Sequence, residues 1–263
     1  MINALRLLTL TLCLALAIIP AWAEDASAVT ALDYTIVQRH AHDNTAFTQG
    51  LLFDGDRLYE STGLYGQSSL RYSVPGETTA IAVDLPDNIF AEGIAVLNQR
   101  LYLLTWKDRQ LLSYDPDTLT LQSNQRYHAE GWGMTTDGTH LITSDGSDRI
   151  RFRDPATLTV MASIDVRENG KPLKMINELE WIHDAAGGAI WANVWPQSRI
   201  VRIDPQTGNV THSLDLSALL RNEPNSADPQ NTLNGIAWQI SSQTLWVTGK
   251  RWQYLYQLRI NGL

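Results

Sequence analysis

The sequence predicts an all-β fold, a five-bladed β-propeller closed by pairing of the N- and C-terminal strands. A short motif occurs five times. It begins with a polar residue or a tryptophan, continues with a marker glycine that is a glutamate in one copy, and ends in a mostly apolar strand. Successive copies are 43, 40, 45 and 57 residues apart, a period typical of propeller blades with four short strands each. A two-sheet β-sandwich also has short strands and regular turns, but the fivefold motif favours the propeller. The copies begin at Gln49, Glu92, Trp132, Asn177 and Asn234.

Residues 1–23 are typical of a Sec signal peptide. Arg6 supplies a positive charge, an apolar run extends from Leu7 to Ile19, and Ala21-Trp22-Ala23 forms an A-x-A cleavage pattern. This run is shorter than the ~20 residues that span a bilayer as a helix, so an uncleaved membrane anchor is the weaker alternative. We therefore expect an exported protein, periplasmic or secreted, whose residues 24–263 form one propeller domain.

The composition excludes several classes of partner and site. The 263 residues contain 20 Lys and Arg against 28 Asp and Glu, a net charge of −8, which argues against nucleic acids and anionic membranes as partners. The one cysteine, Cys13, lies in the predicted signal peptide, so a disulfide scaffold and a cysteine-rich zinc site are excluded. We expect a monomer with no membrane association after signal cleavage.

Two segments outside the repeats are predicted to close the ring. The segment Leu32–Gln38 alternates like an edge strand ahead of the first repeat, and Tyr254–Ile260 ends the chain. We expect both in the closing blade. Hairpin residues such as Asp54-Gly55 join the first and second strands of each repeat.

Residues at the same repeat position meet in space in a propeller, because the innermost strands line the central channel. Two such sets of equivalent residues are informative: the row just before the marker glycine and the row just beyond the second strand of each repeat. Together they predict one shared cup with a carboxylate, amides, an ammonium group and indole walls. Such a mixture is typical of a small-molecule site. Alternatively, the amides satisfy backbone groups at the channel mouth, and two of the tryptophans are equally compatible with packing. The second row consists of Gly63, Trp106, Gly146, Trp195 and Lys250.

Other chemistry has weaker support. The pattern His40-x-His42-Asp43 could bind a metal, but further ligands at useful spacing are lacking. Glu178 and Glu180 could join Glu92 in a carboxylate pair such as glycosidases use. Only Glu92 lies in the channel-mouth row, however, and Glu178 replaces the repeat glycine, where it could instead brace the neighbouring backbone.

Several motifs, in order, resemble the plant-type glutaminyl cyclases, or glutamine cyclotransferases. They extend over about residues 40–260 and include Phe47-Thr-Gln-Gly50, Gly131-Trp-Gly133, Asn177-Glu-Leu-Glu180 and Val247-Thr-Gly-Lys250. The resemblance implies a five-bladed propeller. It also implies an acyltransferase that converts the N-terminal glutamine of peptides or proteins into pyroglutamate and releases ammonia. No metal is implied for catalysis, and a structural calcium is left open.

The resemblance also implies roles for individual residues. Glu92 matches the essential glutamate, which we expect to act as general base and then acid. Asn177 and Lys250 match substrate-holding groups, which we expect to stabilise the carboxamide oxygen. The turn at 183–188 and the loop at 222–231 depart from the family pattern and are expected to reshape the rim. The alternative is a non-catalytic periplasmic propeller that binds peptide or glycan. Substrate-binding roles are implied for Phe47, Gln49, Trp106, Trp132 and Trp195.

Overall fold

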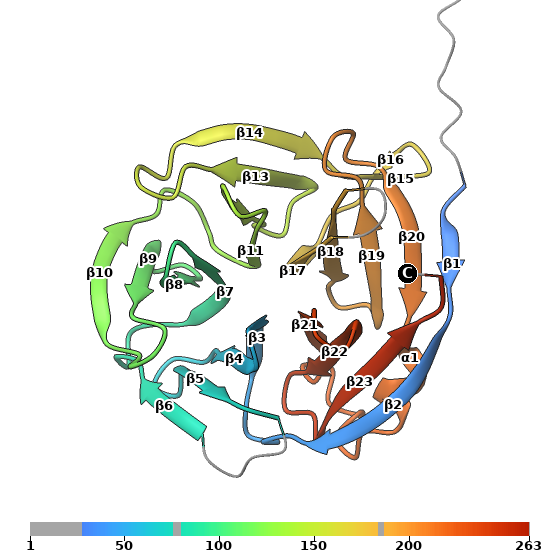
Figure 1. Ribbon diagram of the computed structural model, residues 1–263, viewed down its shortest axis with the longest axis horizontal. Helices are drawn as coiled ribbons and strands as arrows, with labels where there is room; N and C mark the ends of the chain where they lie inside the picture. Colours follow the sequence, from blue (N-terminus) through green and yellow to red (C-terminus); the bar gives the residue numbers. More distant parts are fainter. Residues whose placement is uncertain (1–27, 76–79, 184–186, 263) are drawn as a thin grey trace, which may run out of the picture.

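The computed structural model describes residues 28–75, 80–183 and 187–262. The predicted signal peptide, residues 1–23, lies outside the described residues. Five blades, each with four antiparallel strands, surround a central axis, as the propeller prediction requires (Figure 1), and the sheet of one blade carries a fifth strand at its outer edge. A β-sandwich is thereby excluded. In the part of the chain that the structure describes, no helix is long and apolar enough to cross a membrane.

Each blade follows one repeat of the sequence. Blade 1 consists of β3 (Thr48–Asp54), β4 (Arg57–Thr62), β5 (Ser69–Ser73) and β6 (Ala80–Asp84). Blade 2 consists of β7 (Ala91–Leu97), β8 (Arg100–Thr105), β9 (Gln110–Tyr114) and β10 (Leu121–Arg126). Blade 3 consists of β11 (Met134–Thr136), β12 (Leu141–Thr143), β13 (Arg149–Arg153) and β14 (Val160–Asp165). Blade 4 consists of β17 (Ile176–Ile182), β18 (Ala189–Val194), β19 (Arg199–Ile203) and β20 (Val210–Asp215).

Blade 5 closes the ring with strands from both ends of the chain. It contains β21 (Leu233–Gln239), β22 (Thr244–Gly249), β23 (Tyr254–Ile260) and the N-terminal β2 (Tyr34–Ala41). Antiparallel pairing of β2 with β23 confirms the predicted closure.

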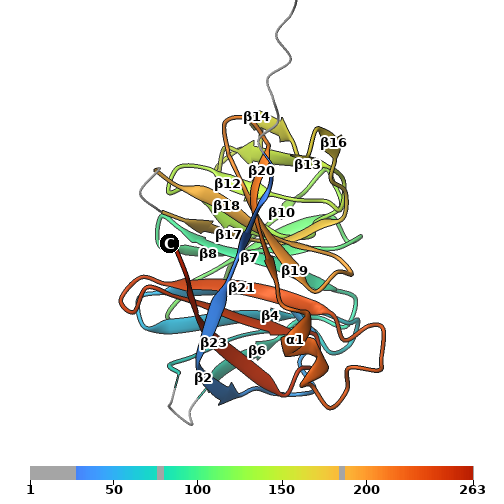
Figure 2. The ribbon, with the colours of Figure 1, turned by 90° about the vertical axis from the view of Figure 1, so that its right-hand side faces the viewer.

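The N-terminal segment also reaches the neighbouring blade. The short β1 (Thr30–Leu32) pairs in parallel with β20 of blade 4. Leu32 was expected in the closing strand but therefore belongs to the neighbouring blade. Consequently β1 and β2 run along the outside of two adjacent blades (Figure 2). The remaining elements are β15 (Arg167–Glu168), β16 (Lys171–Pro172) and α1 (Ser217–Arg221).

The first strand of every repeat is the innermost one. Each of these strands contacts the next, in the ring order β3, β7, β11, β17, β21 and back to β3. The marker glycines permit this approach: a Cβ at Gly133 would lie 2.0 Å from the carbonyl oxygen of Asn177. Where Glu178 replaces the glycine, its carboxylate accepts a hydrogen bond from the Leu51 backbone N–H at 3.3 Å. The expected bracing role of Glu178 is thus confirmed.

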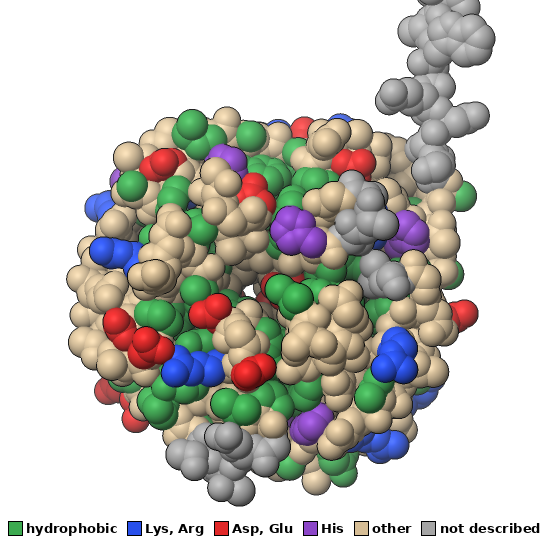
Figure 3. Space-filling view, in the orientation of Figure 1, with side chains coloured by type: hydrophobic (Ala, Val, Ile, Leu, Met, Phe, Trp, Pro, Cys, Tyr) green, Lys and Arg blue, Asp and Glu red, His purple; other side chains and the backbone are tan. Residues whose placement is uncertain are grey.

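The hydrophobic core lies between the blades rather than at the axis. Five clusters of buried apolar side chains each join two neighbouring blades, one at every interface around the ring. Trp191 belongs to the cluster between blades 4 and 5, and Trp246 to the cluster between blades 5 and 1. The axis itself stays open, and a narrow opening is visible at the centre of one face (Figure 3). The propeller therefore holds its inner strands rigidly while leaving space at their ends.

Candidate active site

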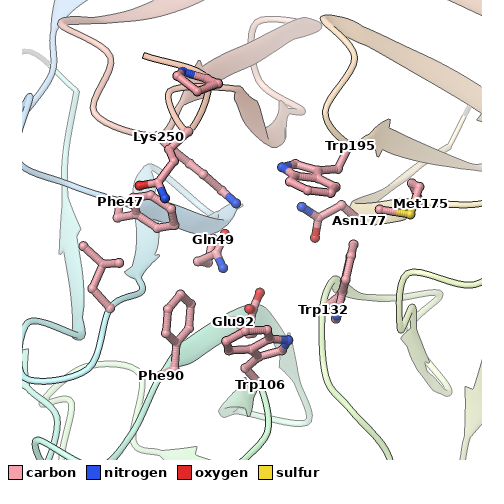
Figure 4. A pocket seen from close by; sticks show the side chains of 13 residues that line it. Phe47, Gln49, Phe90, Glu92, Trp106, Trp132, Met175, Asn177, Trp195 and Lys250 are labelled. Atoms are coloured by element: carbon pink, nitrogen blue, oxygen red, sulfur yellow. The ribbon is translucent and has the colours of Figure 1, made fainter. Parts of the chain in front are cut away.

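The two repeat rows converge at one mouth of the central channel. Seven of their ten members line a cavity of about 520 Å³. The carboxylate of Glu92, the ammonium of Lys250 and the amide of Asn177 point toward a common space, with aromatic rings around them (Figure 4). The structure brings together all eight residues singled out from the sequence: Phe47, Gln49, Glu92, Trp106, Trp132, Asn177, Trp195 and Lys250.

Irregular strand pairing directs the first row into the cavity. The register shifts between Ala91 and Ile94 on β7, so that Glu92 has no directly paired residue on β8. The same irregularity occurs at the equivalent positions of β3, β17 and β21. Because a bulge turns a side chain away from the regular strand direction, it explains why residues inside strands reach the channel mouth.

Glu92 is a buried carboxyl group beside a buried cation. Its residue is only 4% exposed, and burial raises the pKa of its carboxyl well above the ordinary value, with a smaller contribution from the charge of Glu130. The charge of Lys250 and a hydrogen bond from Gln49 oppose this rise. A carboxyl with a raised pKa exchanges protons closer to neutral pH, as a general acid or base must.

Lys250 lies just beyond the end of β22. Burial lowers the pKa of its ammonium group, and the charge of Glu92 counteracts this effect. Its Nζ lies 4.8 Å from the centre of the Phe47 ring, within cation–π range. The adjacent Arg251 donates its backbone N–H to the carbonyl oxygen of Ala46 at 2.6 Å. The turn that carries Lys250 is therefore tied to the segment that carries Phe47.

A fully buried asparagine connects two lining residues. The Nδ2 of Asn177 donates to the Oδ1 of Asn234 at 2.9 Å. Asn234 in turn donates its Nδ2 to the carbonyl oxygen of Thr48 at 3.0 Å and faces the Gln49 side-chain oxygen at 3.3 Å. Asn234 thus links the side-chain amides of Gln49 in blade 1 and Asn177 in blade 4, although Asn234 itself does not line the cavity.

Two buried polar atoms of the cavity wall have no partner within the described structure. They are the Oδ1 of Asn177, an acceptor, and the Nε1 of Trp132, a donor. Buried polar groups are normally hydrogen-bonded, and an unpaired one is costly. Both belong to side chains that line the cavity, so its wall contains one acceptor and one donor that the described structure leaves unsatisfied.

Further lining residues were not identified from the sequence. Phe90 and Met175 lie three residues before the marker position of their repeats, as Phe47 does, so this third row could have revealed them. The glycines of the second row also have a spatial reason, because a Cβ at Gly63 would lie 2.4 Å from the Phe90 ring. Leu64 follows that glycine and completes the wall.

The two departures from the family pattern lie on different faces. Pro229 and Gln230 of the 222–231 loop line the cavity, so this loop does shape the rim. The described residues of the 183–188 turn do not lie there as expected, and residues 184–186 lie outside the described part of the chain. The turn follows Ile182 at the far end of β17, whereas Asn177 lies at the beginning of that strand. Its described residue His183 lines a different pocket, with Glu180.

The histidines of the His40-x-His42-Asp43 pattern have structural partners. His40 stacks on Trp246 at 4.5 Å. His42 lies within hydrogen-bond distance of the Glu60 carboxylate (3.0 Å) and the Trp252 carbonyl oxygen (2.8 Å). Both partners are acceptors, an arrangement that favours the protonated ring, which donates from both nitrogens. Although burial opposes it, the charge of Glu60 raises the pKa of His42.

The ion pair between His42 and Glu60 therefore has a structural role at blade 1 rather than a role in metal binding. Asp43 instead pairs with Arg71 at 2.7 Å. Among the described residues, no group of three or more His, Cys, Asp or Glu side chains is placed to hold a metal ion.

Known proteins share this chain's sequence and architecture. The family model described as glutamine cyclotransferase matches residues 8–260. A glutaminyl-peptide cyclotransferase of Arabidopsis thaliana is 39% identical over 230 residues, which are 86% of this chain and 70% of the relative. The crystal structure of Myxococcus xanthus glutaminyl cyclase matches with a TM-score of 0.78 and 34% identity, over 88% of this chain and 98% of that one.

Proposed function

Because this chain belongs to the glutamine cyclotransferase family, we propose that its cavity converts the N-terminal glutamine of a peptide or protein into pyroglutamate and releases ammonia. The observation that carries the proposal is the meeting of a buried carboxyl, a buried ammonium and unpaired amide and indole atoms in one cavity. These groups come from four different blades, so the propeller serves to bring them together.

The reaction makes three chemical demands. The substrate's α-amine attacks its own γ-carboxamide carbon, so a C–N bond closes a five-membered ring while the amine loses a proton. The carboxamide oxygen becomes an oxyanion. The C–N bond to the leaving nitrogen then breaks, and that nitrogen takes up a proton and departs as ammonia. Because the attack is intramolecular, positioning supplies much of the rate.

Glu92 is proposed to move the proton. As a carboxylate it accepts the proton of the α-amine, whose ordinary pKa is about 7.7–8.0. As a carboxylic acid it then gives that proton to the leaving nitrogen. Its raised pKa suits both directions, because it brings the carboxyl closer to the amine in proton affinity. General acid–base catalysis of this kind contributes about 10²–10⁴-fold in rate.

Lys250 is proposed to stabilise the oxyanion, since its ammonium faces the same space as Glu92 in an apolar surround. Asn177 was also expected to donate to this oxygen. Its Nδ2 donates one N–H to Asn234 and keeps a second one. Its Oδ1 has no partner, which favours a further role as acceptor for an N–H of the substrate. Trp132 can donate through its free Nε1, and the rings of Phe47, Trp106 and Trp195 pack around the glutamine methylenes.

A turnover assay tests the proposal. When the purified protein is incubated with a glutamine-initiated peptide, the mass of the peptide should fall by that of one ammonia. The mass of the matched asparagine-initiated peptide should stay unchanged. Lys250→Ala should lower kcat more than it raises KM, because the oxyanion forms only after binding. Binding of the peptide without any loss of ammonia would instead support the non-catalytic alternative. A glycosidase is disfavoured because Glu92 is the one carboxylate among the described lining residues.

We also propose where and with what the protein acts. The segment 1–23 would direct export, so that the mature propeller acts in the periplasm or outside the cell as a monomer, on peptides and not on nucleic acid. The proposed steps use side chains alone and require no metal. Activity that survives prolonged treatment with a chelator is the expected result, and its irreversible loss would indicate a catalytic or structural ion.

A further inference from the structure

We propose that Tyr65, with Leu64 and Phe90, forms a second subsite at the edge of the cavity, which binds an apolar or aromatic side chain of the residue that follows the N-terminal glutamine. This inference rests on the proposed function, because it concerns the second residue of the same substrate. None of the three was among the site residues identified from the sequence.

An aromatic strip leads from the cavity to the surface. Phe90 lies at its centre, with ring centroids 6.3 Å from Phe47, 5.3 Å from Trp106 and 5.5 Å from Tyr65. Phe47, Phe90 and Trp106 line the cavity, on the side away from Met175 (Figure 4). Tyr65 continues the strip outward and is 48% exposed. The other large exposed apolar residues of the described chain lie on outer strands or at the β21–β22 turn, so Tyr65 alone among them adjoins the cavity.

The turn that carries this ring is fixed to the strand that carries Glu92. Leu64 has a left-handed backbone with φ of 86°, a conformation that a non-glycine residue adopts only where the surroundings enforce it. The enforcing contact comes from buried Ser68, whose hydroxyl donates to the Leu64 carbonyl oxygen at 2.9 Å and accepts the Ala91 N–H at 3.1 Å. The edge of the cavity is therefore formed before any substrate binds.

One carboxylate holds both aromatic residues of the subsite. Asp108 accepts the backbone N–H of Phe90 at 3.0 Å through Oδ2, and its Oδ1 lies 3.5 Å from the Tyr65 hydroxyl. Trp106 donates its backbone N–H to the Phe90 carbonyl oxygen at 3.0 Å. A ring held in this way presents an apolar face at little cost in side-chain entropy, a property typical of binding surfaces.

The position of this surface matches the path of a peptide. The glutamine side chain must lie deep, beside Glu92 and Lys250, so the chain beyond its α-carbon leaves through the mouth. Burial and the neighbouring Asp108 raise the pKa of the Tyr65 hydroxyl, with a smaller contribution from the charge of Glu92. The next side chain in the peptide is then the group within reach of Tyr65.

The test compares peptides that differ only at the second residue. For the wild-type protein we expect kcat/KM to be about tenfold higher for Gln-Phe than for Gln-Gly peptides, as expected for the burial of one large apolar group. Tyr65→Ala should reduce this ratio to about twofold by lowering the Gln-Phe value more than the Gln-Gly value, and Tyr65→Phe should keep the wild-type ratio. Ile81→Ala is the matched control, because Ile81 is similarly exposed on an outer strand.

The outcomes are distinct. A wild-type enzyme that turns over both peptides equally contradicts the subsite alone. A preference that survives Tyr65→Ala but disappears in Met175→Ala places the second residue at the opposite edge and also overturns the inference. A wild-type protein that turns over neither peptide overturns the proposed function itself.

Discussion

The buried amide link through Asn234 gives a prediction that separates positioning from mere stability. Asn234→Ala leaves the Asn177 Nδ2 without its acceptor and takes one donor from the Thr48 carbonyl oxygen. A buried polar group left unpaired costs about 1–3 kcal/mol. Since the Thr48 carbonyl oxygen and the Asn177 amide are both affected, we expect a stability loss near the lower end of the combined range, about 2–3 kcal/mol.

The effect on catalysis should be larger than this loss explains. Without Asn234 the Asn177 amide is free to rotate, and a misplaced group costs up to about 10²-fold in rate. We therefore expect kcat to fall about 10- to 100-fold while the protein stays folded, measured by ammonia release alongside thermal unfolding. Asn193→Ala is the control: Asn193 is equally buried and accepts the Gly235 N–H at 3.0 Å, but unlike Asn234 it is not hydrogen-bonded to a residue that lines the cavity.

A double-mutant cycle then identifies the route of the effect. If Asn234 acts through Asn177, adding Asn234→Ala to Asn177→Ala should change the rate by less than about threefold, because the group being positioned is already absent. Two rate losses that simply multiply would refute this reasoning, as would a wild-type kcat in the single Asn234→Ala variant.

Three further predictions concern pH and space. The raised pKa of Glu92 should place the acid limb of the kcat/KM profile well above pH 4.5, the ordinary value, and a limb at or below that value would contradict its role as base. Glu180, with a pKa of about 8 when folded, keeps its proton in the folded state at pH values where the unfolded chain has lost it. This group alone should therefore lower stability by up to about 5 kcal/mol as pH rises from 4.5 to 8, and Glu180→Gln should reduce the fall in stability measured by urea unfolding by that amount without changing activity. Gly63→Ala should push the Phe90 ring into the cavity and lower kcat/KM about tenfold, and an unchanged value would show that the ring yields elsewhere.

The repeat made much of the fold and site predictable from the sequence. Equivalent positions of successive blades meet around one axis, so Glu92, Asn177 and Lys250 could be grouped although they lie far apart along the chain. The terminal strands could be paired because a ring must close. The same logic applied two positions before Glu92 and Asn177 would have identified Phe90 and Met175.

Other features depend on information that a pattern does not contain. The bulge at Glu92 is a property of strand pairing, and a glycine after it only hints at the close approach. The link from Asn234 to Asn177 depends on which way two amides turn. The error over the 183–188 turn arose because an insertion was assigned to the rim without following the direction of β17, which carries the chain from Asn177 to the opposite face.

The proton-transfer role of Glu92 is the central claim, and one comparison tests it most directly. Ammonia release from a glutamine-initiated peptide should be measured for the wild type, Glu92→Gln and Glu180→Gln, since both variants replace a buried glutamate by its amide. We predict that Glu92→Gln remains folded and loses about 10²–10⁴-fold in kcat, while Glu180→Gln keeps wild-type turnover. Turnover by Glu92→Gln within a few fold of the wild type would contradict the account.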